Sequence, residues 1–138
     1  MHPLRKLREA GPPSVEQVAA LLAENVVFNS PVLVRPLKGR DAVAHAIANS
    51  SRSRDGIGEY VLEKKLDERT TLLRWQGTID GHKLESLELL VDDNAGKLVE
   101  RTIAYRPFPA VRLFRDRMRA SPMNAVPDDI WEYPEIAP

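Results

Sequence analysis

The chain has 138 residues, enough for one domain, and its twenty basic and twenty acidic side chains cancel to a formal net charge of zero. A domain of this size buries roughly two-thirds of the surface that its unfolded chain exposes, so its core needs no disulfide or metal. The absence of cysteine excludes disulfides, thiolate metal sites and cysteine nucleophiles. The balanced charge offers no global field that would attract nucleic acid or a membrane, and neither is expected as a partner.

The N-terminal part of the chain is predicted to hold three helices and one strand. Ser14 caps the second helix, because Gln17 stands three residues on, at the capping-box spacing. Pro31 ends the strand, which lies in the alternating stretch AENVVFNSPV. The predicted ranges are 3–10 for the first helix, a start at Ser14 for the second, 23–32 for the strand and about 41–51 for the third helix.

The rest of the chain is predicted to form long antiparallel strands and a last helix. Asp80-Gly81 between two alternating runs indicates a two-residue hairpin, and the turn DDNAG leads into the final strand. The predicted strands are 58–66, 70–79, 82–91 and 97–106, and the predicted helix is 109–120. Helices followed by antiparallel strands imply an α+β domain over residues 1–120, with an extended, proline- and acid-rich tail over residues 121–138.

The hairpin geometry predicts which side chains share a face of the sheet. Ile79 pairs with His82 across the first turn, and a bulge at Gly96 in the second turn would pair Glu88 with Glu100. One face then mixes apolar and polar side chains and is assigned to the helices and a pocket. The other face carries an apolar block, which we expect to pair with a second copy of the chain about a twofold axis. This block consists of Leu87, Leu89, Val91, Val99, Ile103 and Tyr105.

The ordered set LLAENVVFNSPV, LKGRDAVAHAI, the Asp-Gly hairpin, DDNAGKLVE and IAYRP resembles the nuclear-transport-factor-2-like (NTF2-like) superfamily, and in particular its SnoaL-like branch. The resemblance covers roughly residues 14–120. It implies a cone in which about three helices pack on the concave face of a curved antiparallel sheet, with a cavity between them and a short C-terminal helix. Dimers are common in this family. Its members include ketosteroid isomerases, limonene epoxide hydrolases, polyketide cyclases, dehydratases and binding modules, so the fold implies no single function.

The resemblance also indicates where a ketosteroid isomerase carries its proton-moving aspartate, just before the matching proline. Ser30 stands there in this sequence and cannot act as a carboxylate base. A protonated acid on a later strand of that enzyme matches Glu88 if no gap is allowed, or Leu87 if the turn shifts by one residue. The predicted hairpin favours Glu88, since it places that residue on the pocket face.

Glu88 and Glu100 are therefore the candidate catalytic residues. Two carboxylates that close cannot both ionise at low cost, so the pKa of one is expected to rise and supply a general acid beside a general base. The alternative is that both carboxylates are held by Arg106 or Thr102, or lie at a solvated rim. The other candidate ligand contacts are Ser30, Asn29, Tyr60, Trp75, Ser86, Thr102 and Arg106. Core packing is the favoured explanation of Tyr60 and Trp75, and a capping or turn role explains Asn29 at least as well.

We predict that the chain is a cofactor-independent pocket protein for a small lipophilic molecule. The residues leave open whether it is an isomerase, cyclase, dehydratase or epoxide hydrolase, or no enzyme at all. The alternative is a non-catalytic dimeric scaffold or protein-interaction module. No metal is expected, because the three histidines lack ligand spacing. A cytoplasmic location is expected, because the N-terminal stretch has no signal-peptide core and no apolar run is long enough to span a membrane.

Overall fold

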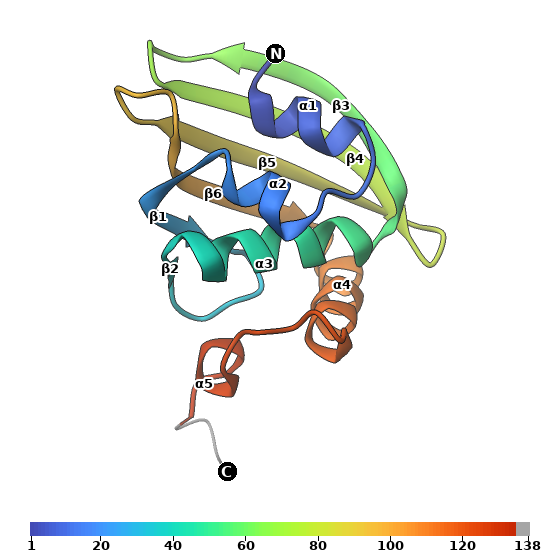
Figure 1. The fold of residues 1–138 in the computed structure, drawn as a ribbon. Helices are drawn as coiled ribbons and strands as arrows, with labels where there is room; N and C mark the ends of the chain where they lie inside the picture. Colours follow the sequence, from blue (N-terminus) through green and yellow to red (C-terminus); the bar gives the residue numbers. More distant parts are fainter. Residues whose placement is uncertain (135–138) are drawn as a thin grey trace.

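The computed structural model describes residues 1–134 of the chain. A strongly curved six-stranded sheet forms the back of the molecule, three helices cover its concave face, and a fourth helix lies at one end (Figure 1). This is the predicted α+β cone. The end of the predicted tail, residues 135–138, lies outside the described residues.

The sheet has the order β2-β1-β6-β5-β4-β3. Neighbouring strands are antiparallel except β1 and β6, which run parallel. The four long strands β3 to β6 follow one another as a meander, as the sequence predicts, whereas the short strand β2 is not predicted. The strand bounds are Leu22–Asn29 for β1, Leu37–Lys38 for β2, Asp55–Lys65 for β3, Thr70–Ile79 for β4, His82–Asp92 for β5 and Leu98–Arg106 for β6.

The predicted helices are all present, and the cap of the second one follows its sequence signal. The Ser14 hydroxyl accepts a hydrogen bond from the backbone N–H of Gln17 at 3.1 Å, and the Gln17 side chain accepts one from the N–H of Ser14 at 2.9 Å. This capping box fixes the start of the second helix. The helix bounds are Pro3–Glu9 for α1, Val15–Ala19 for α2, Arg40–Arg52 for α3, Phe108–Ala120 for α4 and Asp128–Trp131 for α5.

The C-terminal tail is not extended throughout, contrary to the prediction, because it contains helix α5. The Trp131 side chain is buried against the core, and the backbone N–H of Val34 donates to the carbonyl of Ile130 at 2.8 Å. Burial of one large aromatic side chain holds this segment against the loop that follows β1. The α5 helix therefore packs on the domain rather than projecting from it.

The first hairpin has the predicted register, but the second does not. All pairs from Thr70 with Val91 to Ile79 with His82 are as expected. Across the second turn, Glu88 pairs with Ile103 instead of Glu100. An irregularity in this ladder leaves one residue of β6 between Leu98, which pairs with Asp92, and Glu100.

That extra residue exchanges the two faces of β6, because side chains alternate with a period of two. Leu98 and Arg101 both point to the helices although they are three residues apart, and both are buried. Ile103 follows them on the inner face. Glu100, Thr102 and Arg106, predicted on the inner face, lie on the outer one.

Candidate interior site

Four buried charged side chains from four separate segments meet on the concave, inner face of the sheet. They are Glu88 on β5, Arg101 on β6, Arg8 on α1 and Arg54 in the connection between α3 and β3, and we call them the interior cluster. Each residue is at least 94% buried. Arginine and glutamate are rarely buried so completely unless they are paired.

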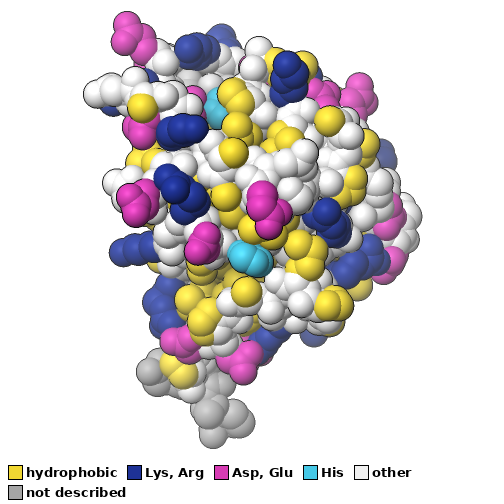
Figure 2. Space-filling model, viewed as in Figure 1, with side chains coloured by type: hydrophobic (Ala, Val, Ile, Leu, Met, Phe, Trp, Pro, Cys, Tyr) yellow, Lys and Arg dark blue, Asp and Glu magenta, His cyan; other side chains and the backbone are white. Residues whose placement is uncertain are grey.

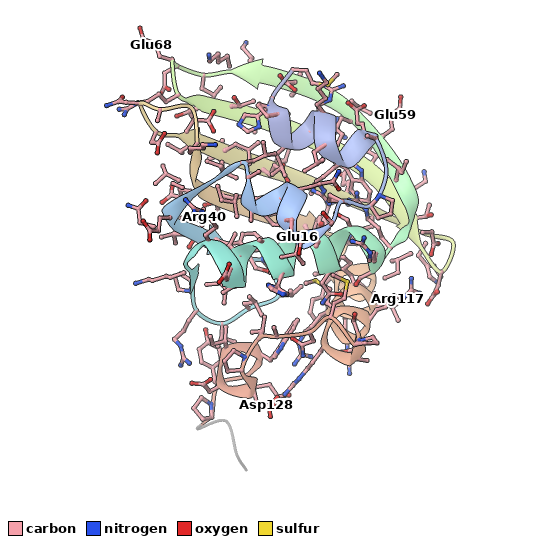
Figure 3. The ribbon with its side chains drawn as sticks, in the orientation of Figure 1. Glu16, Arg40, Glu59, Glu68, Arg117 and Asp128 are labelled. Carbon is pink, nitrogen blue, oxygen red and sulfur yellow. The ribbon has the colours of Figure 1, made fainter. Side chains whose placement is uncertain are left out.

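Other charged side chains of this protein behave differently. Both signs of charge are scattered over the helix-covered face (Figure 2). Glu59, Glu68 and Asp128 project from the edges of the fold into solvent (Figure 3). The interior cluster is thus an exception that needs a specific explanation.

Glu88 and Arg101 form the centre of the interior cluster. An Nη2–H of Arg101 donates to Oε2 of Glu88 at 2.9 Å, and Arg8 Nη1 lies 4.0 Å from the same oxygen. Burial alone would raise the pKa of Glu88, but the charges of Arg101 and Arg8 outweigh it and hold this pKa below its ordinary value. Glu88 is therefore an ionised carboxylate and not the protonated acid or raised-pKa partner that the sequence suggested.

Arg8 reaches the interior cluster from the first helix of the chain. Its Nε–H donates to the Ser51 hydroxyl at 3.2 Å, and an Nη1–H donates to the Tyr60 hydroxyl at 3.3 Å. Burial raises the pKa of Tyr60, so this hydroxyl keeps its proton. Arg8 therefore ties α1 to α3 and β3 as well as to the carboxylate.

Among residues 1–134, Arg54 has no such carboxylate partner. Its guanidinium stacks on the Trp75 ring, with Cζ 4.1 Å from the ring centroid. Burial, with the positive charge of Arg8 beside it, lowers the pKa of Arg54 to about 9. The positive charge on Arg54 is thus opposed by its surroundings.

Trp75 is held in place by its neighbours and acts as a platform for Arg54. The indole Nε1–H donates to the carbonyl of Ile57 at 2.9 Å. A Cβ atom at Gly58 or at Gly77 would overlap the indole ring, so both glycines make room for it. This packing fits the core role that the sequence left open for Trp75.

Polar atoms of the interior cluster remain without a hydrogen-bond partner. Among residues 1–134, all five buried side-chain nitrogens and oxygens without a partner belong to these four residues. Three guanidinium groups and one carboxylate also leave an excess of two positive charges in the interior. The unpartnered atoms are Arg8 Nη2, Arg54 Nε, Arg101 Nε and Nη1, and Glu88 Oε1.

A narrow opening borders the interior cluster at the end of the sheet near α4. Its volume is about 10 Å³, close to what one water needs, so the large cavity that the resemblance implies is not open at this point. Phe28, which lines the opening, lies under the Arg101 guanidinium at 5.1 Å from Cζ to the ring centroid. The lining residues are Phe28, Ser30, Pro31, Ser50, Ile103, Tyr105, Phe114 and Met118.

Five of the predicted site residues lie on the inner side or at the opening. Glu88, Ser86, Tyr60 and Trp75 are buried on the inner face, as predicted. Ser30 lines the opening, and its hydroxyl accepts a hydrogen bond from the N–H of Val32 at 3.2 Å. The roles of these residues in binding or catalysis stay predictions.

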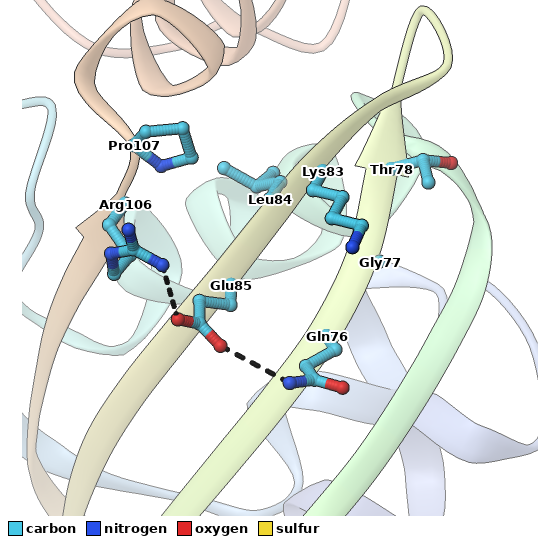
Figure 4. Close-up of a pocket in the computed structure, with 8 residues that line it drawn as sticks. All are labelled: Gln76, Gly77, Thr78, Lys83, Leu84, Glu85, Arg106 and Pro107. Atoms are coloured by element: carbon cyan, nitrogen blue, oxygen red, sulfur yellow. Dashed lines mark hydrogen bonds and ion pairs between the residues drawn. The ribbon is translucent and has the colours of Figure 1, made fainter.

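The other predicted site residues lie on the outer face. Asn29 donates to the Thr102 hydroxyl at 2.9 Å across the parallel β1–β6 pair. Glu100 faces outward on the same strand as Thr102, and the predicted carboxylate pair does not form. Arg106 pairs with Glu85 at 2.8 Å and lines a shallow outer groove of about 460 Å³ (Figure 4).

Sequence reasoning missed Arg8, Arg54, Arg101 and Tyr105. A signal for Arg8 was available, since it stands four residues after the buried Leu4 and shares its helix face. Arg101 and Tyr105 were assigned to the wrong face by the register error. Arg54 lies in a connection without periodicity, and no local pattern marks it.

Among residues 1–134, no group of three or more histidine, aspartate or glutamate side chains is arranged to hold a metal ion. In the same part of the chain, no helix combines the length and apolar character of a membrane span.

No protein-family model and no curated protein matches the chain. Solved structures do match over most of its length. One is an uncharacterised protein with a cystatin-like fold from Silicibacter pomeroyi, with a TM-score of 0.77 and 23% identity over 87% of this chain and 85% of that one. Another is a steroid delta-isomerase from Pseudomonas aeruginosa, with a TM-score of 0.72 and 20% identity over 85% of this chain and 82% of that one.

A third match is an epoxide hydrolase/cyclase-like enzyme with a role in pyran-ring formation in the polyether salinomycin. Its TM-score is 0.56, at 16% identity over 78% of this chain and 87% of that one. Further matches are described as NTF2-like proteins of unknown function. The cone of helices and curved sheet defines an α+β class, and these matches identify the fold as NTF2-like, as the sequence motifs suggested. At sequence identities this low, the similarity to these structures establishes the fold alone.

Proposed function

We propose that this chain binds a small organic molecule inside its cone. The molecule would enter at the opening beside Ser30 and place its polar end at the interior cluster. The observation that carries the proposal is the set of buried polar atoms of Arg8, Arg54, Glu88 and Arg101 that have no partner among residues 1–134. Buried polar groups in proteins are nearly always hydrogen-bonded, so these atoms point to a missing partner.

A purely structural role explains the interior cluster poorly. A buried ion pair contributes little net stability, because desolvation of both charges offsets their attraction. Well-packed apolar side chains in the same positions would stabilise the fold as well or better. Buried charges of this kind gather preferentially at functional sites, which supports a role in binding.

Entry of a molecule larger than water requires side chains at the opening to move. Phe114 and Met118 line it from α4, and Ser30 and Pro31 line it from the loop after β1. A shift of α4 or of this loop would widen the opening without breaking the sheet. Rearrangements of a loop or segment on binding occur in a substantial minority of complexes.

The state of Glu88 favours binding over proton transfer. An efficient general acid or base has a pKa near the working pH, and the arginines hold the pKa of Glu88 below its ordinary value. Two similar structures are described as a steroid delta-isomerase and an epoxide hydrolase/cyclase-like enzyme. They make polycyclic and oxygenated ring compounds reasonable ligands to try, and turnover of such a ligand would use Glu88 as a weak base.

The test is a thermal-shift screen of the purified protein against steroids, terpene epoxides and aromatic polyketides. A ligand at ~100 times its dissociation constant should add about 2.7 kcal/mol to the free energy of unfolding. Ser30→Leu should abolish the shift by filling the opening, whereas Asn29→Leu, on the outer face, should retain it. Equal shifts in both variants would place the ligand elsewhere and refute the interior site.

We further propose that the outer face pairs with a second copy of the chain. Ile103 and Tyr105 no longer belong to this face, but Leu62, Leu87 and Leu89 on it are 42%, 51% and 39% exposed. Leu62 and Leu87 both stand opposite Arg74, in one row across three strands. Opposite charges also lie beside them, so a twofold-related copy could match apolar with apolar and Arg74 with Glu85.

Sedimentation velocity at micromolar concentration tests the dimer. The parent protein should sediment as a dimer and Leu87→Glu as a monomer, while Leu113→Glu, at an exposed position on α4, should remain dimeric. A parent protein that is monomeric under these conditions would contradict the proposal. A dimer that binds none of the small molecules would favour the alternative of a scaffold module.

A further inference from the structure

We propose that the interior cluster is an anion-binding site, and that the natural ligand presents a carboxylate or phosphate group to Arg8, Arg54 and Arg101. This inference rests on the proposed function, because it names the chemical class of the molecule that binds inside the cone. It does not follow from the fold, which the similar structures share at low sequence identity. It follows from the charges and donors of this chain alone.

The first step of the argument is the charge balance of the interior cluster. The interior cluster has three guanidinium groups and one carboxylate, and the carboxylate is already engaged by Arg101 at 2.9 Å, with Arg8 at 4.0 Å. Ordered water can satisfy hydrogen bonds in such a place, but it cannot neutralise charge. A buried net positive charge is costly, and a bound anion removes that cost.

The second step is the supply of unpartnered donors. Arg8 Nη2, Arg54 Nε, and Arg101 Nε and Nη1 are the buried nitrogens without an acceptor among residues 1–134. They come from three separate segments of the chain, so a single acceptor group could bridge them. Guanidinium forks match the oxygens of carboxylate and phosphate, and such charge-assisted hydrogen bonds are the strongest that side chains form.

The third step is the state of Arg54. Its guanidinium is fixed over the Trp75 ring and has no carboxylate within ion-pair distance among the described residues. Burial and the charge of Arg8 lower its pKa to about 9. An anion beside Arg54 would reverse this effect, so binding of the anion and charging of Arg54 stabilise each other.

The apolar lining of the opening indicates the chemical character of the part of the ligand beyond its anionic group. Phe28, Ile103, Phe114 and Met118 line the opening, and Phe28 also lies under the Arg101 guanidinium. An anionic group with an apolar body therefore fits better than a fully polar anion. A lipophilic carboxylic acid or an alkyl phosphate is the simplest molecule of this kind.

The experiment compares matched ligands that differ only in charge. Octanoate, benzoate and naphthoate are titrated against their primary amides at constant ionic strength, with thermal shift and calorimetry as readouts. The acids should bind at least about tenfold more tightly than the amides to the parent protein, and this preference should disappear in Arg54→Met. Arg74→Met removes an arginine of the outer face and should keep the preference. If Arg54→Met does not fold, Arg54→Gln replaces it.

Each outcome decides between the proposals. Equal binding of acid and amide would overturn the anion site while leaving a small-molecule pocket in place. Binding of neither, together with no response to inorganic phosphate or chloride, would overturn both. An Arg54-dependent stabilisation by inorganic phosphate or chloride alone would support the anion site but assign it to a free ion and not to the end of an organic acid.

Discussion

Strand β5 carries two glutamates whose surroundings are alike in chemistry and opposite in exposure. Glu88 faces the helices and pairs with Arg101, and both side chains are buried. Glu85, three residues earlier, faces solvent and pairs with Arg74 at 3.0 Å and Arg106 at 2.8 Å. We call Glu85, Arg74 and Arg106 the outer cluster. The side chains of Arg74 and Arg106 are 45% and 72% exposed. The strand thus presents a glutamate paired with arginine twice, once buried in the interior and once exposed to solvent.

The difference teaches what each cluster can contribute. In the outer cluster, the hydrogen bonds of Arg106, Arg74 and Gln76 lower the pKa of Glu85 to about 2, but water screens these charges (Figure 4). In the interior cluster, nothing screens the charges, so each group depends on its partner and an excess charge attracts a counter-ion. The outer cluster is a surface network, whereas the interior cluster has the properties of a binding site.

The largest predicted effect comes from removing one partner of the interior pair. Arg101→Met leaves the Glu88 carboxylate buried without its nearest counter-charge and should lower the free energy of unfolding by about 3–5 kcal/mol. The matched change on the outer face, Arg74→Met, should have a much smaller effect. Urea denaturation at 25 °C measures both. Equal losses in the two variants would show that burial does not distinguish the clusters.

The free energies lost on removing Glu88 and on removing Arg101 should not add. The double variant Glu88→Leu/Arg101→Met replaces the interior pair with apolar side chains of similar size. The double variant leaves Arg8 and Arg54 buried without this carboxylate, but it should lose less stability than the sum of the two single variants, with a coupling free energy of about 1–3 kcal/mol in the double-mutant cycle. Strict additivity of the two single changes would mean that Glu88 and Arg101 do not depend on each other.

The pH dependence of stability should differ in amplitude between the two glutamates. Both folded-state pKa values lie below the ordinary value of 4.5, so the unfolded chain binds more protons and stability falls as the pH drops. The advantage of the parent protein over Glu88→Gln should therefore be complete above about pH 5 and shrink as the pH falls below 4.5. For Glu85→Gln, the advantage shrinks between pH 4.5 and about 2 but is small throughout. Denaturation curves from pH 7 to pH 3 measure this. A difference in the free energy of unfolding between the parent protein and Glu88→Gln that grew as the pH fell would contradict the prediction.

The sequence predicted the elements because their signals are local. The Asp80-Gly81 turn fixes every pair of the first hairpin, and the capping box fixes the start of α2. The second hairpin was mispaired for an equally local reason. Its turn closes with the N–H of Asp93 donating to the carbonyl of Lys97, and one extra residue then follows Leu98 in β6. A single residue of this kind leaves the strand bounds unchanged and reverses its faces.

The interior cluster could be predicted only in part. Glu88 was placed correctly, because the Asp80-Gly81 turn determines its face. Arg101 was placed on the wrong face, because the extra residue after Leu98 in β6 was not predicted. Arg8 and Arg54 come from segments far along the chain from β5, and their approach to Glu88 depends on how α1 and α3 pack on the sheet. Tertiary contacts of this kind leave no periodic signal in the sequence.

The central claim is that Arg54 of the interior cluster serves binding and not folding, and the stability of Arg54→Met tests it most directly. Arg54 lacks a counter-charge within the described part of the chain, so replacing it with an apolar side chain of similar length removes a buried charge without isolating another. The variant should be as stable as the parent protein or more stable by up to about 1 kcal/mol, in urea at 25 °C without ligand. A loss of stability as large as that of Arg101→Met would contradict the account, because it would show that Arg54 is needed to hold the fold together.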